Sequence, residues 1–181
     1  MSLAHASDWQ VVRRNDPRAA ALADRHYSRK SPGHPQFTPP GRCLVLLATH
    51  ARAVWVSSWP YPEYASHSFL QEDVWLCTLF RNEAPERSLS SHLIMQAVAA
   101  TRWQWGEPPH VGMITFVDPA KVRHKRDAGR CFRKAGWHVA GYTKSGLLVL
   151  QIQEQEMPHA APAVGQSLLL FSEETHEEVN A

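Results

Sequence analysis

The hydrophobic positions of the chain follow two different periodicities, and together they predict both strands and helices. Two apolar runs in RCLVLLATHARAVWVSSW, residues 42–59, flank a short polar link, which is typical of a β-hairpin. The apolar run DVWLCTLF, residues 73–80, predicts a buried strand, and HVGMITFVDP, residues 110–119, predicts a strand closed by Asp-Pro. A second hairpin is predicted by WHVAGYTKSGLLVLQI, residues 137–152, with Lys-Ser-Gly at its turn.

Helical periodicity appears in three other segments. Asp16 as N-cap and Pro17 in the first turn predict a short helix over about residues 17–26. Apolar side chains recur every three or four positions in SLSSHLIMQAVAATRWQW, residues 88–105, which makes it the clearest helix. The segment RDAGRCFRKAG, residues 126–136, predicts a third, short helix.

The order of these elements is helix, two strands, strand, helix, strand, helix and two strands. This order predicts an α/β (α+β) protein with one mixed sheet and helices packed on it. The 181 residues fit one domain, which we assign to residues 1–153. Residues 154–181 form a tail that is rich in Pro and Ala at first and acidic at its end. We expect residues 156–166 to be loose, and SLLLF, residues 167–171, is a candidate last strand.

The charge is distributed unevenly along the chain. The tail carries six acidic residues and no Lys or Arg, so the 17 acidic and 19 basic residues of the whole chain leave the body with 19 basic against 11 acidic residues. A net charge of +8 on the body favours a polyanionic partner, with a solvated basic surface as the alternative. No apolar run is long enough for a membrane helix, and the N-terminus has no signal-peptide core, so we expect a soluble, cytoplasmic protein.

Cysteine and histidine spacing gives no metal or disulfide pattern. Cys43, Cys77 and Cys131 are odd in number and far apart, which favours buried small hydrophobic side chains over a disulfide framework or a zinc site. The histidines are scattered, so no metal ligand is assigned and the metal requirement stays open.

Basic residues gather in two stretches. The first is DRHYSRKSPGHPQF, residues 24–37, and the second is KVRHKRDAGRCFRK, residues 121–134. Side chains of this kind are suited to contact nucleic-acid phosphates, although a solvated surface has the same composition. The candidate nucleic-acid-binding residues are Arg25, Arg29, Lys30, Arg123, Lys125, Arg126 and Arg130.

Three residues are candidates for proton transfer. Asp118 ends a strand just before Pro119, at the sheet edge where ligands gather in open α/β sheets, although Asp-Pro also starts turns. Its carboxylate can accept a hydrogen bond from an amino group and raise the nucleophilicity of that group. Tyr27 is suited to general acid–base catalysis or to stacking on an extruded base, and His26 to moving a proton. A half-buried tyrosine and a lone surface histidine are the structural alternatives.

Arg81 and the serines that follow it are candidates for binding an anion. Arg81 directly follows an apolar strand, so it needs an anionic partner, either a phosphate or Glu83 or Glu86. The serine hydroxyls at the start of the long helix can contact a phosphate or simply cap the helix, and capping is expected for Ser88. The serines are Ser88, Ser90 and Ser91.

The order of elements, ending in GRCFRKAGWHVAGYTKSG, resembles the GNAT-type acyltransferase fold. The resemblance implies a mixed, mostly antiparallel sheet with helices on both faces, splayed at its centre between the strands at 73–81 and 111–117. It also implies acetyl-CoA or another acyl-CoA at the splay, with the following helix N-terminus directed at the pyrophosphate. The Gly-rich turn of that family is replaced here by RNEAPERSLSSH.

Residues 24 to 146 also resemble the Mom family of bacteriophage DNA-modification proteins, a divergent GNAT branch. The matching segments are RHYSRK, LFRNEA, SSHLIMQA, TFVDP, GRCFRKAG and VAGYT, in this order. Where that family has a Tyr in the last helix, this chain has Phe132.

The Mom resemblance implies transfer of a carbamoylmethyl group to the exocyclic amine of adenine in DNA. It implies catalytic roles for Tyr27, His26, Asp118, Arg81 and Ser91, and cofactor contacts for Arg81, Ser90, Ser91, Gly129 and Phe132. The alternatives are an acyl-CoA-dependent N-acetyltransferase acting on a small amine or a protein amine, and a non-catalytic nucleic-acid-binding protein. The oligomeric state, including a homodimer, stays open.

Overall fold

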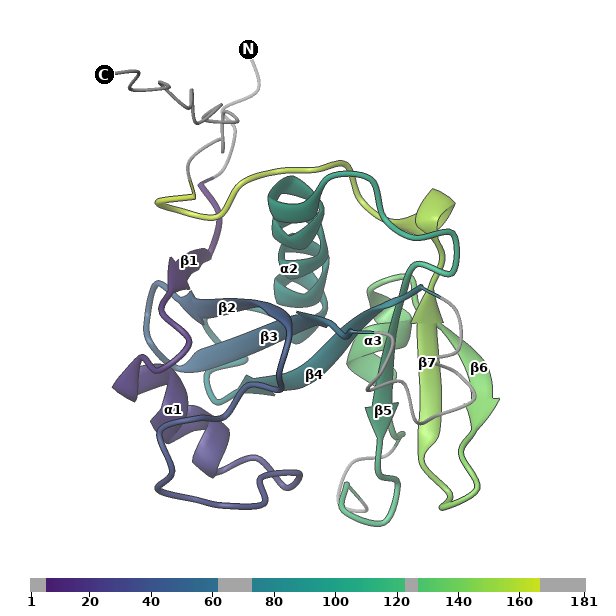
Figure 1. Cartoon of the computed structure of the whole chain (residues 1–181), viewed down its shortest axis with the longest axis horizontal. Coiled ribbons are helices and arrows are strands. Elements are labelled where there is room, and N and C mark those ends of the chain that lie inside the picture. Colours follow the sequence, from purple (N-terminus) through teal and green to yellow (C-terminus); the bar gives the residue numbers. More distant parts are fainter. Residues whose placement is uncertain (1–5, 62–72, 123–126, 167–181) are drawn as a thin grey trace, which may run out of the picture.

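The computed structural model describes residues 6–61, 73–122 and 127–166, and these residues form a mixed seven-stranded sheet (Figure 1). The spatial order is β1-β2-β3-β4-β5-β7-β6. Only the β4–β5 pair is parallel among the strand pairs of the described residues, and the other pairs are antiparallel. The predicted mixed sheet is therefore confirmed. The strands are β1 (Trp9–Val12), β2 (Arg42–Ala48), β3 (Ala53–Trp59), β4 (Trp75–Asn82), β5 (Met113–Val117), β6 (His138–Tyr142) and β7 (Leu148–Ile152).

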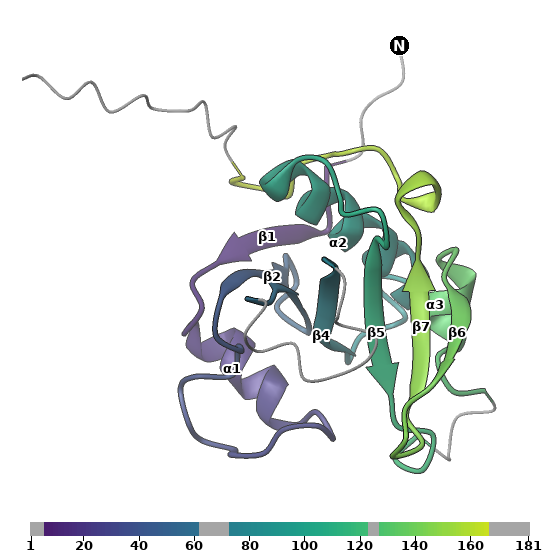
Figure 2. The same cartoon turned by 45° about the vertical axis from the view of Figure 1, so that its right-hand side comes forward.

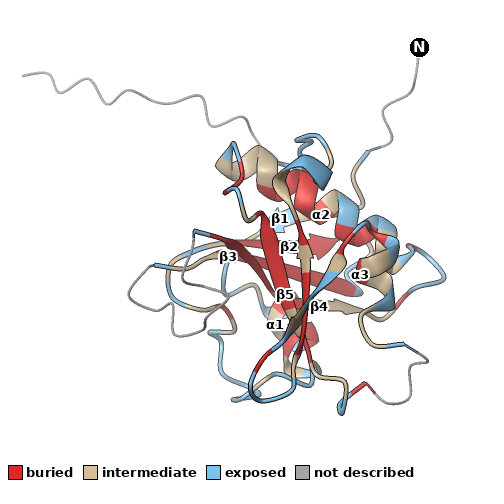
Figure 3. Cartoon of the chain, turned by 90° about the vertical axis from the view of Figure 1, so that its right-hand side faces the viewer, coloured by how far each residue is buried: buried red, intermediate tan, exposed pale blue. Residues whose placement is uncertain are grey.

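Helices cover both faces of the sheet, as expected. Helix α2 (Ser90–Trp105) and the short α3 (Arg130–Lys134) pack on one face, and α1 (Pro17–Asp24) packs on the other. Because both faces are covered, the central strands are buried on both sides and are apolar without alternation. In β2, for example, Leu44 and Leu46 join the core beneath α2, whereas Val45 and Leu47 join the core beneath α1. Figure 3 shows this concentration of buried residues in the strands.

The two longer helices begin in different ways. The Asp16 carboxylate accepts hydrogen bonds from the N–H groups of Arg18 and Ala19, so the predicted cap of α1 is confirmed. The N-cap of α2 is Leu89, and no side chain caps it. The expectation that Ser88 caps this helix is wrong, because Ser88 is buried one residue before the N-cap.

Strands β4 and β5 meet only briefly at the centre of the sheet. Trp75, Leu76 and Cys77 pair with Met113, Ile114 and Thr115, and the pairing then stops. Beyond this point β4 continues along β3, and Figures 1 and 2 show β4 and β5 diverging. A register shift against β3 leaves Thr78 as an extra residue on β4, which is a β-bulge.

Residues 157–166 are packed, so the expectation that 156–166 is loose is wrong. The segment crosses α2, where the N–H of Ala161 donates to the carbonyl of Ala99 (Figure 1). The backbone N–H of Val164 donates to the carbonyl of Trp9 in β1. The sequence pattern did not predict this strand. Met157 and Ala163 are buried, and they hold the segment on the core. The proposed last strand, residues 167–171, lies outside the described residues.

Among the three cysteines, Cys77 is buried, whereas Cys43 and Cys131 are half-buried, so the expected burial holds for Cys77 alone. In the part of the chain that the structure describes, no helix has both the length and the apolar character required to cross a membrane.

Candidate functional site

A cleft of about 330 Å³ opens where β4 and β5 part. It draws on the segment after α1, on β4, on the end of β5 and on the turn before β7. A volume of this size lies at the lower end of ligand sites, which suits a small planar group. The residues that line the cleft are His26, Tyr27, Ser28, Leu76, Cys77, Thr78, Phe116, Asp118, Lys121 and Leu147.

Asp118 enters the cleft from the end of β5. Its Oδ1 accepts a hydrogen bond from the N–H of Ala120 at 2.9 Å, so the residue also builds the turn that follows the strand. The turn and the cleft are therefore compatible roles for one carboxylate. The backbone N–H of Asp118 donates to the hydroxyl oxygen of Tyr27 at 3.3 Å.

Tyr27 reaches the cleft from the opposite side, just after α1. Burial raises the pKa of the phenol, and the nearby Asp118 charge raises it further, whereas the Asp118 N–H lowers it. The net shift is upward, so the hydroxyl keeps its proton throughout the neutral range. Because the oxygen already accepts from Asp118, the hydroxyl proton is available to donate elsewhere.

The ring of His26 stacks on the ring of Tyr27, with centroids 4.4 Å apart and planes 30° apart. The Nδ1 of His26 accepts the N–H of Ser28 at 3.2 Å and lies 2.7 Å from the Ser28 hydroxyl oxygen. These contacts assign the proton of the neutral ring to Nε2. Stacking and hydrogen bonding thus hold both rings in one orientation.

The floor of the cleft is apolar and contains a thiol. Burial strongly raises the pKa of Cys77, so this side chain stays a thiol at neutral pH and is a poor nucleophile. The Thr115 hydroxyl donates to the carbonyl of Cys77 at 3.0 Å and joins β5 to β4 at the last paired position. Leu76, Phe116 and Leu147 supply apolar surface for the face of a ring.

Two predicted catalytic residues do not line the cleft. The Arg81 guanidinium donates from Nε to Glu83 at 2.6 Å and from Nη1 to the carbonyl of Arg25 at 2.6 Å. Its anionic partner is therefore Glu83, one of the alternatives open from the sequence. Ser91 lies in the first turn of α2 and is not among the residues that line the cleft.

The predicted cofactor contacts fall into two groups. The Ser90 hydroxyl accepts from the Asn82 side chain at 3.1 Å, which ties the start of α2 to the end of β4. Gly129 is the N-cap of α3 with φ of 71°, and Phe132 is buried in the core, where its ring contacts Trp137, Phe80 and Trp55. The structure thus assigns structural roles to Gly129 and Phe132, and it does not bring either residue to the cleft.

The predicted phosphate contacts also differ among themselves. Arg29 is almost buried and donates to Asp24 at 2.8 Å and to the carbonyls of Gln36 and His34, so it organises its own loop. Arg25 forms a bidentate pair with Glu83. Lys30 and Arg130 are exposed. The remaining three, Arg123, Lys125 and Arg126, lie outside the described residues.

Sequence reasoning missed Thr78 and the apolar lining of the cleft, and it named neither Lys121 nor Ser28 as a site residue, although both lie in the two basic stretches. Lys121 had a signal, because it follows Asp118 by three positions at a strand end. Thr78 had no sequence signal, because a β-bulge within an apolar run does not change the hydrophobic pattern. In the described ranges, no group of three or more His, Cys, Asp or Glu side chains is arranged to hold a metal ion.

Comparisons with family models, with curated proteins and with solved structures find no match to this chain.

Proposed function

We propose that the chain is a group-transfer enzyme of GNAT type that modifies the exocyclic amine of a nucleobase in DNA. Adenine and a carbamoylmethyl-like group are the acceptor and modification that the Mom resemblance suggests. The observation that carries the proposal is the meeting of Tyr27, His26 and Asp118 in the cleft where β4 and β5 part. Segments far apart in the chain supply these groups, and each is oriented by a contact of its own.

The three groups divide the chemistry of amine modification between them. The Asp118 carboxylate accepts a hydrogen bond from the amino group and takes one of its protons as the new N–C bond forms. The Tyr27 hydroxyl, which is protonated at neutral pH, donates its proton to the group that leaves the donor carbon. His26 stacks on Tyr27 and keeps its ring in place.

The dimensions of the cleft favour a single base. A volume of about 330 Å³ with Leu76, Phe116 and Leu147 on its walls is suited to one planar ring. A base in a duplex reaches such a cleft only after it leaves the stack, and an aromatic side chain at the mouth, here Tyr27, stabilises the extruded ring.

Exposed lysines at the same end of the molecule support a polyanionic substrate. Lys121 lines the cleft, Lys30 follows the cleft residue Ser28, and Lys144 lies in the turn that leads to the cleft residue Leu147. Figure 1 shows these three loops at one end of the fold. We call Lys30, Lys121 and Lys144 the lysine rim.

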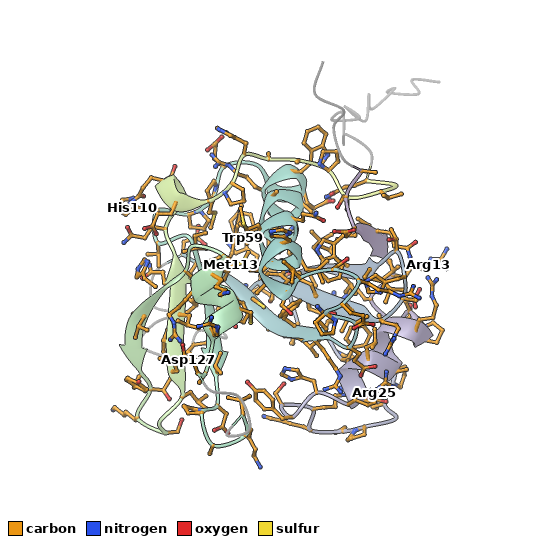
Figure 4. All side chains as sticks on the ribbon, turned by 180° about the vertical axis from the view of Figure 1, so that it is seen from behind. Arg13, Arg25, Trp59, His110, Met113 and Asp127 are labelled. Atoms are coloured by element: carbon orange, nitrogen blue, oxygen red, sulfur yellow. The ribbon has the colours of Figure 1, made fainter. Side chains whose placement is uncertain are left out.

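Apart from the Asp118 carboxylate in the cleft, the acidic side chains described near the rim are paired with arginines. Asp24 pairs with Arg29, and Glu83 pairs with Arg25 and Arg81. On the other side of the same end, Asp127 pairs with Arg133, and Figure 4 shows the positions of Arg25 and Asp127. The uncompensated charge of the rim is therefore positive, which attracts phosphates. DNA as substrate is consistent with the cytoplasmic location that we expect.

A second candidate function is acyl-CoA-dependent N-acetylation of a small amine or a protein amine. The observation that favours it is the short β4–β5 pairing with a bulge at Thr78, because an extended acyl chain can enter between strands that part. Acetyl-CoA or another acyl-CoA is the donor in this second function. The apolar residues that line the parting strands would contact its acyl end.

The deciding experiment is mass spectrometry of nucleosides from plasmid DNA of cells that express the chain, beside cells that express Asp118→Ala. We expect a new adenine-derived nucleoside that is absent with the variant. Unchanged nucleosides with folded protein would contradict the proposal. Calorimetry with acetyl-CoA would then separate the acetyltransferase, which binds it, from a non-catalytic nucleic-acid-binding protein, which does not.

A further inference from the structure

The carboxylate of Glu83 joins two arginines that come from different parts of the chain. Arg25 donates from Nε to Oε1 at 2.8 Å and from Nη2 to Oε2 at 2.9 Å. Arg81 donates from Nε to Oε1 at 2.6 Å. We call these three side chains the Glu83 hub. The hydrogen bonds from Arg25, and then those from Arg81, lower the pKa of Glu83 to about 2, so the hub is ionised at neutral pH.

The hub is bonded to the peptide group that leads into the cleft. The carbonyl of Arg25 accepts from Arg81 Nη1 at 2.6 Å, and the N–H of the same peptide group, on His26, donates to the carbonyl of Ala23 at 2.9 Å. With both polar groups held, this peptide plane is fixed. Its orientation sets the direction in which His26 and Tyr27 leave the main chain.

Glu83 is itself anchored to the strands. Its N–H donates to the carbonyl of Arg52 at 2.8 Å, and the Arg52 guanidinium donates to the carbonyl of Glu83 at 3.0 Å. The Asn82 side chain accepts from the N–H of Ala84 at 3.0 Å and fixes the next turn. The hub therefore fixes the segment after α1 relative to the end of β4 and the turn before β3.

We propose that Glu83 is a positioning residue which, through Arg81 and Arg25, holds His26 and Tyr27 over the cleft opposite Asp118. An effect of Glu83 on the reaction rate rests on the proposed function, whereas its effect on the positions of His26 and Tyr27 does not. The proposal also assigns a role to Arg81, which lies near the end of β4 without lining the cleft. Arg81 acts on the site through the carbonyl of Arg25.

A neighbouring ion pair provides a matched control. Glu86 pairs with Arg52 at 3.7 Å, and both side chains are more than half exposed, at 63% and 52%. The Glu83 side chain is 22% exposed and accepts three charge-assisted hydrogen bonds. Exposed pairs of the first kind contribute little, whereas bidentate pairs fix geometry.

The test is NMR of the full chain with ¹³C-labelled tyrosine and ¹⁵N-labelled backbone, in the wild type and in Glu83→Gln, Arg81→Lys and Glu86→Gln. Loss of the hub frees the segment after α1, so Tyr27 gains solvent and loses the Asp118 N–H. Burial is the largest cause of the raised pKa of Tyr27, so the gain of solvent outweighs the loss of the Asp118 N–H, which lowers it. We therefore expect the pKa of Tyr27 to fall toward its ordinary value of 10.0 in Glu83→Gln and Arg81→Lys. The Asp118 amide should exchange about tenfold faster in both variants.

In Glu86→Gln, the pKa of Tyr27 and the exchange rate of the Asp118 amide should equal those of the wild type. Wild-type readings in folded Glu83→Gln and Arg81→Lys would overturn the proposal, as would equal changes in Glu86→Gln. Arg81→Lys keeps the charge but cannot bond Glu83 and the Arg25 carbonyl together, so it tests geometry if Glu83→Gln fails to fold. These readings need no substrate, so they stand even if no modified nucleoside is found. Where the nucleoside does form, its rate should fall in Glu83→Gln with DNA affinity unchanged.

Discussion

The backbone N–H of Asp118 donates to the hydroxyl oxygen of Tyr27, a contact between residues 91 positions apart in the chain. It joins the segment after α1 to the end of β5 across the mouth of the cleft. It also occupies a lone pair of the phenol, and the raised pKa keeps the phenol protonated. One backbone contact thus prepares the hydroxyl as a donor toward the cleft.

Replacing Tyr27 with Phe should abolish most activity without unfolding the protein. The change removes the proton donor and leaves the Asp118 N–H to water, because this end of the cleft is open to solvent. We expect the yield of modified nucleoside per unit time to fall about 100-fold, the lower range for loss of a general acid. The free energy of unfolding should fall by about 1 kcal/mol, as for one hydrogen bond.

Tyr142→Phe is the matched control for this variant, because Tyr142 is 64% exposed on the edge strand β6. Its activity should equal that of the wild type. Full activity in Tyr27→Phe would remove the hydroxyl from the mechanism.

Glu83 should make the stability of the fold depend on acid pH. Its folded-state pKa of about 2 lies below its ordinary value of 4.5, so the ionised form is favoured by folding. The stability it contributes is fully present above pH 4.5 and is lost as the pH falls toward 2. We expect Glu83→Gln to lower the free energy of unfolding by about 1 kcal/mol at pH 7.

The difference between wild type and Glu83→Gln should shrink through that acid window, be small at pH 2 and vanish below it. Urea unfolding at a series of pH values measures it, with Glu86→Gln expected to track the wild type. A difference that is the same at pH 7 and pH 2 would show that the effect of the variant is not electrostatic.

The lysine rim should set the salt dependence of DNA binding. Each phosphate contact contributes about 0.9 to the slope of log K against log salt on duplex DNA, and about 0.7 on single strands. Changing Lys30, Lys121 and Lys144 together to Gln should therefore reduce the magnitude of the slope by about 2 to 3. Fluorescence anisotropy with a labelled oligonucleotide measures the slope.

The control for the rim is a variant with the same change in charge elsewhere. Arg13, Arg42 and Arg87 are exposed on segments that do not line the cleft and lie outside the two basic stretches. Changing these three residues together to Gln should reduce the slope of log K against log salt only slightly. An equal effect of both triple variants would mean that DNA contacts the whole basic surface and not the mouth of the cleft.

The sequence predicted the fold better than the site. Apolar runs located the first hairpin and the central strands because their side chains are buried on two faces. The second hairpin was located from the apolar run of β7 and the Lys-Ser-Gly turn, since no residue of β6 is buried. Strand β1 was not predicted because WQVV is short and mixed in polarity. The packing of residues 157–166 was not predicted because it depends on contacts with α2 and not on a hydrophobic periodicity. Asp118 was predicted correctly to lie at a cleft because it ends a strand at the carboxyl edge of the sheet.

The same reasoning could not separate arginines that bind a ligand from arginines that bind the protein. Arg29 and Arg81 are indistinguishable from phosphate contacts in sequence, since their partners are carbonyls and carboxylates set by tertiary structure. Phe132 is buried in the core and does not line the cleft, because its position in the pattern is shared by core aromatic residues.

Gly129 should be required for stability whether or not a ligand is bound. Its φ of 71° is unfavourable for other residues, and a Cβ would lie 2.4 Å from Cδ1 of Leu150, which is fully buried and has little room to move. Gly136 has φ of 88° but nothing within 4 Å of a Cβ, so Gly136→Ala carries only the backbone cost. We expect about 1 kcal/mol for Gly136→Ala and about 1–3 kcal/mol more for Gly129→Ala.

Thermal and urea unfolding of the two variants, without any added ligand, measure the difference directly. A larger loss in Gly129→Ala would establish that the glycine is needed for the approach of α3 to β7. Equal losses would show that Leu150 yields, and the role of Gly129 would then reduce to its backbone conformation. Either result separates the structural requirement from the cofactor contact that the sequence suggested, because no cofactor is present in the measurement.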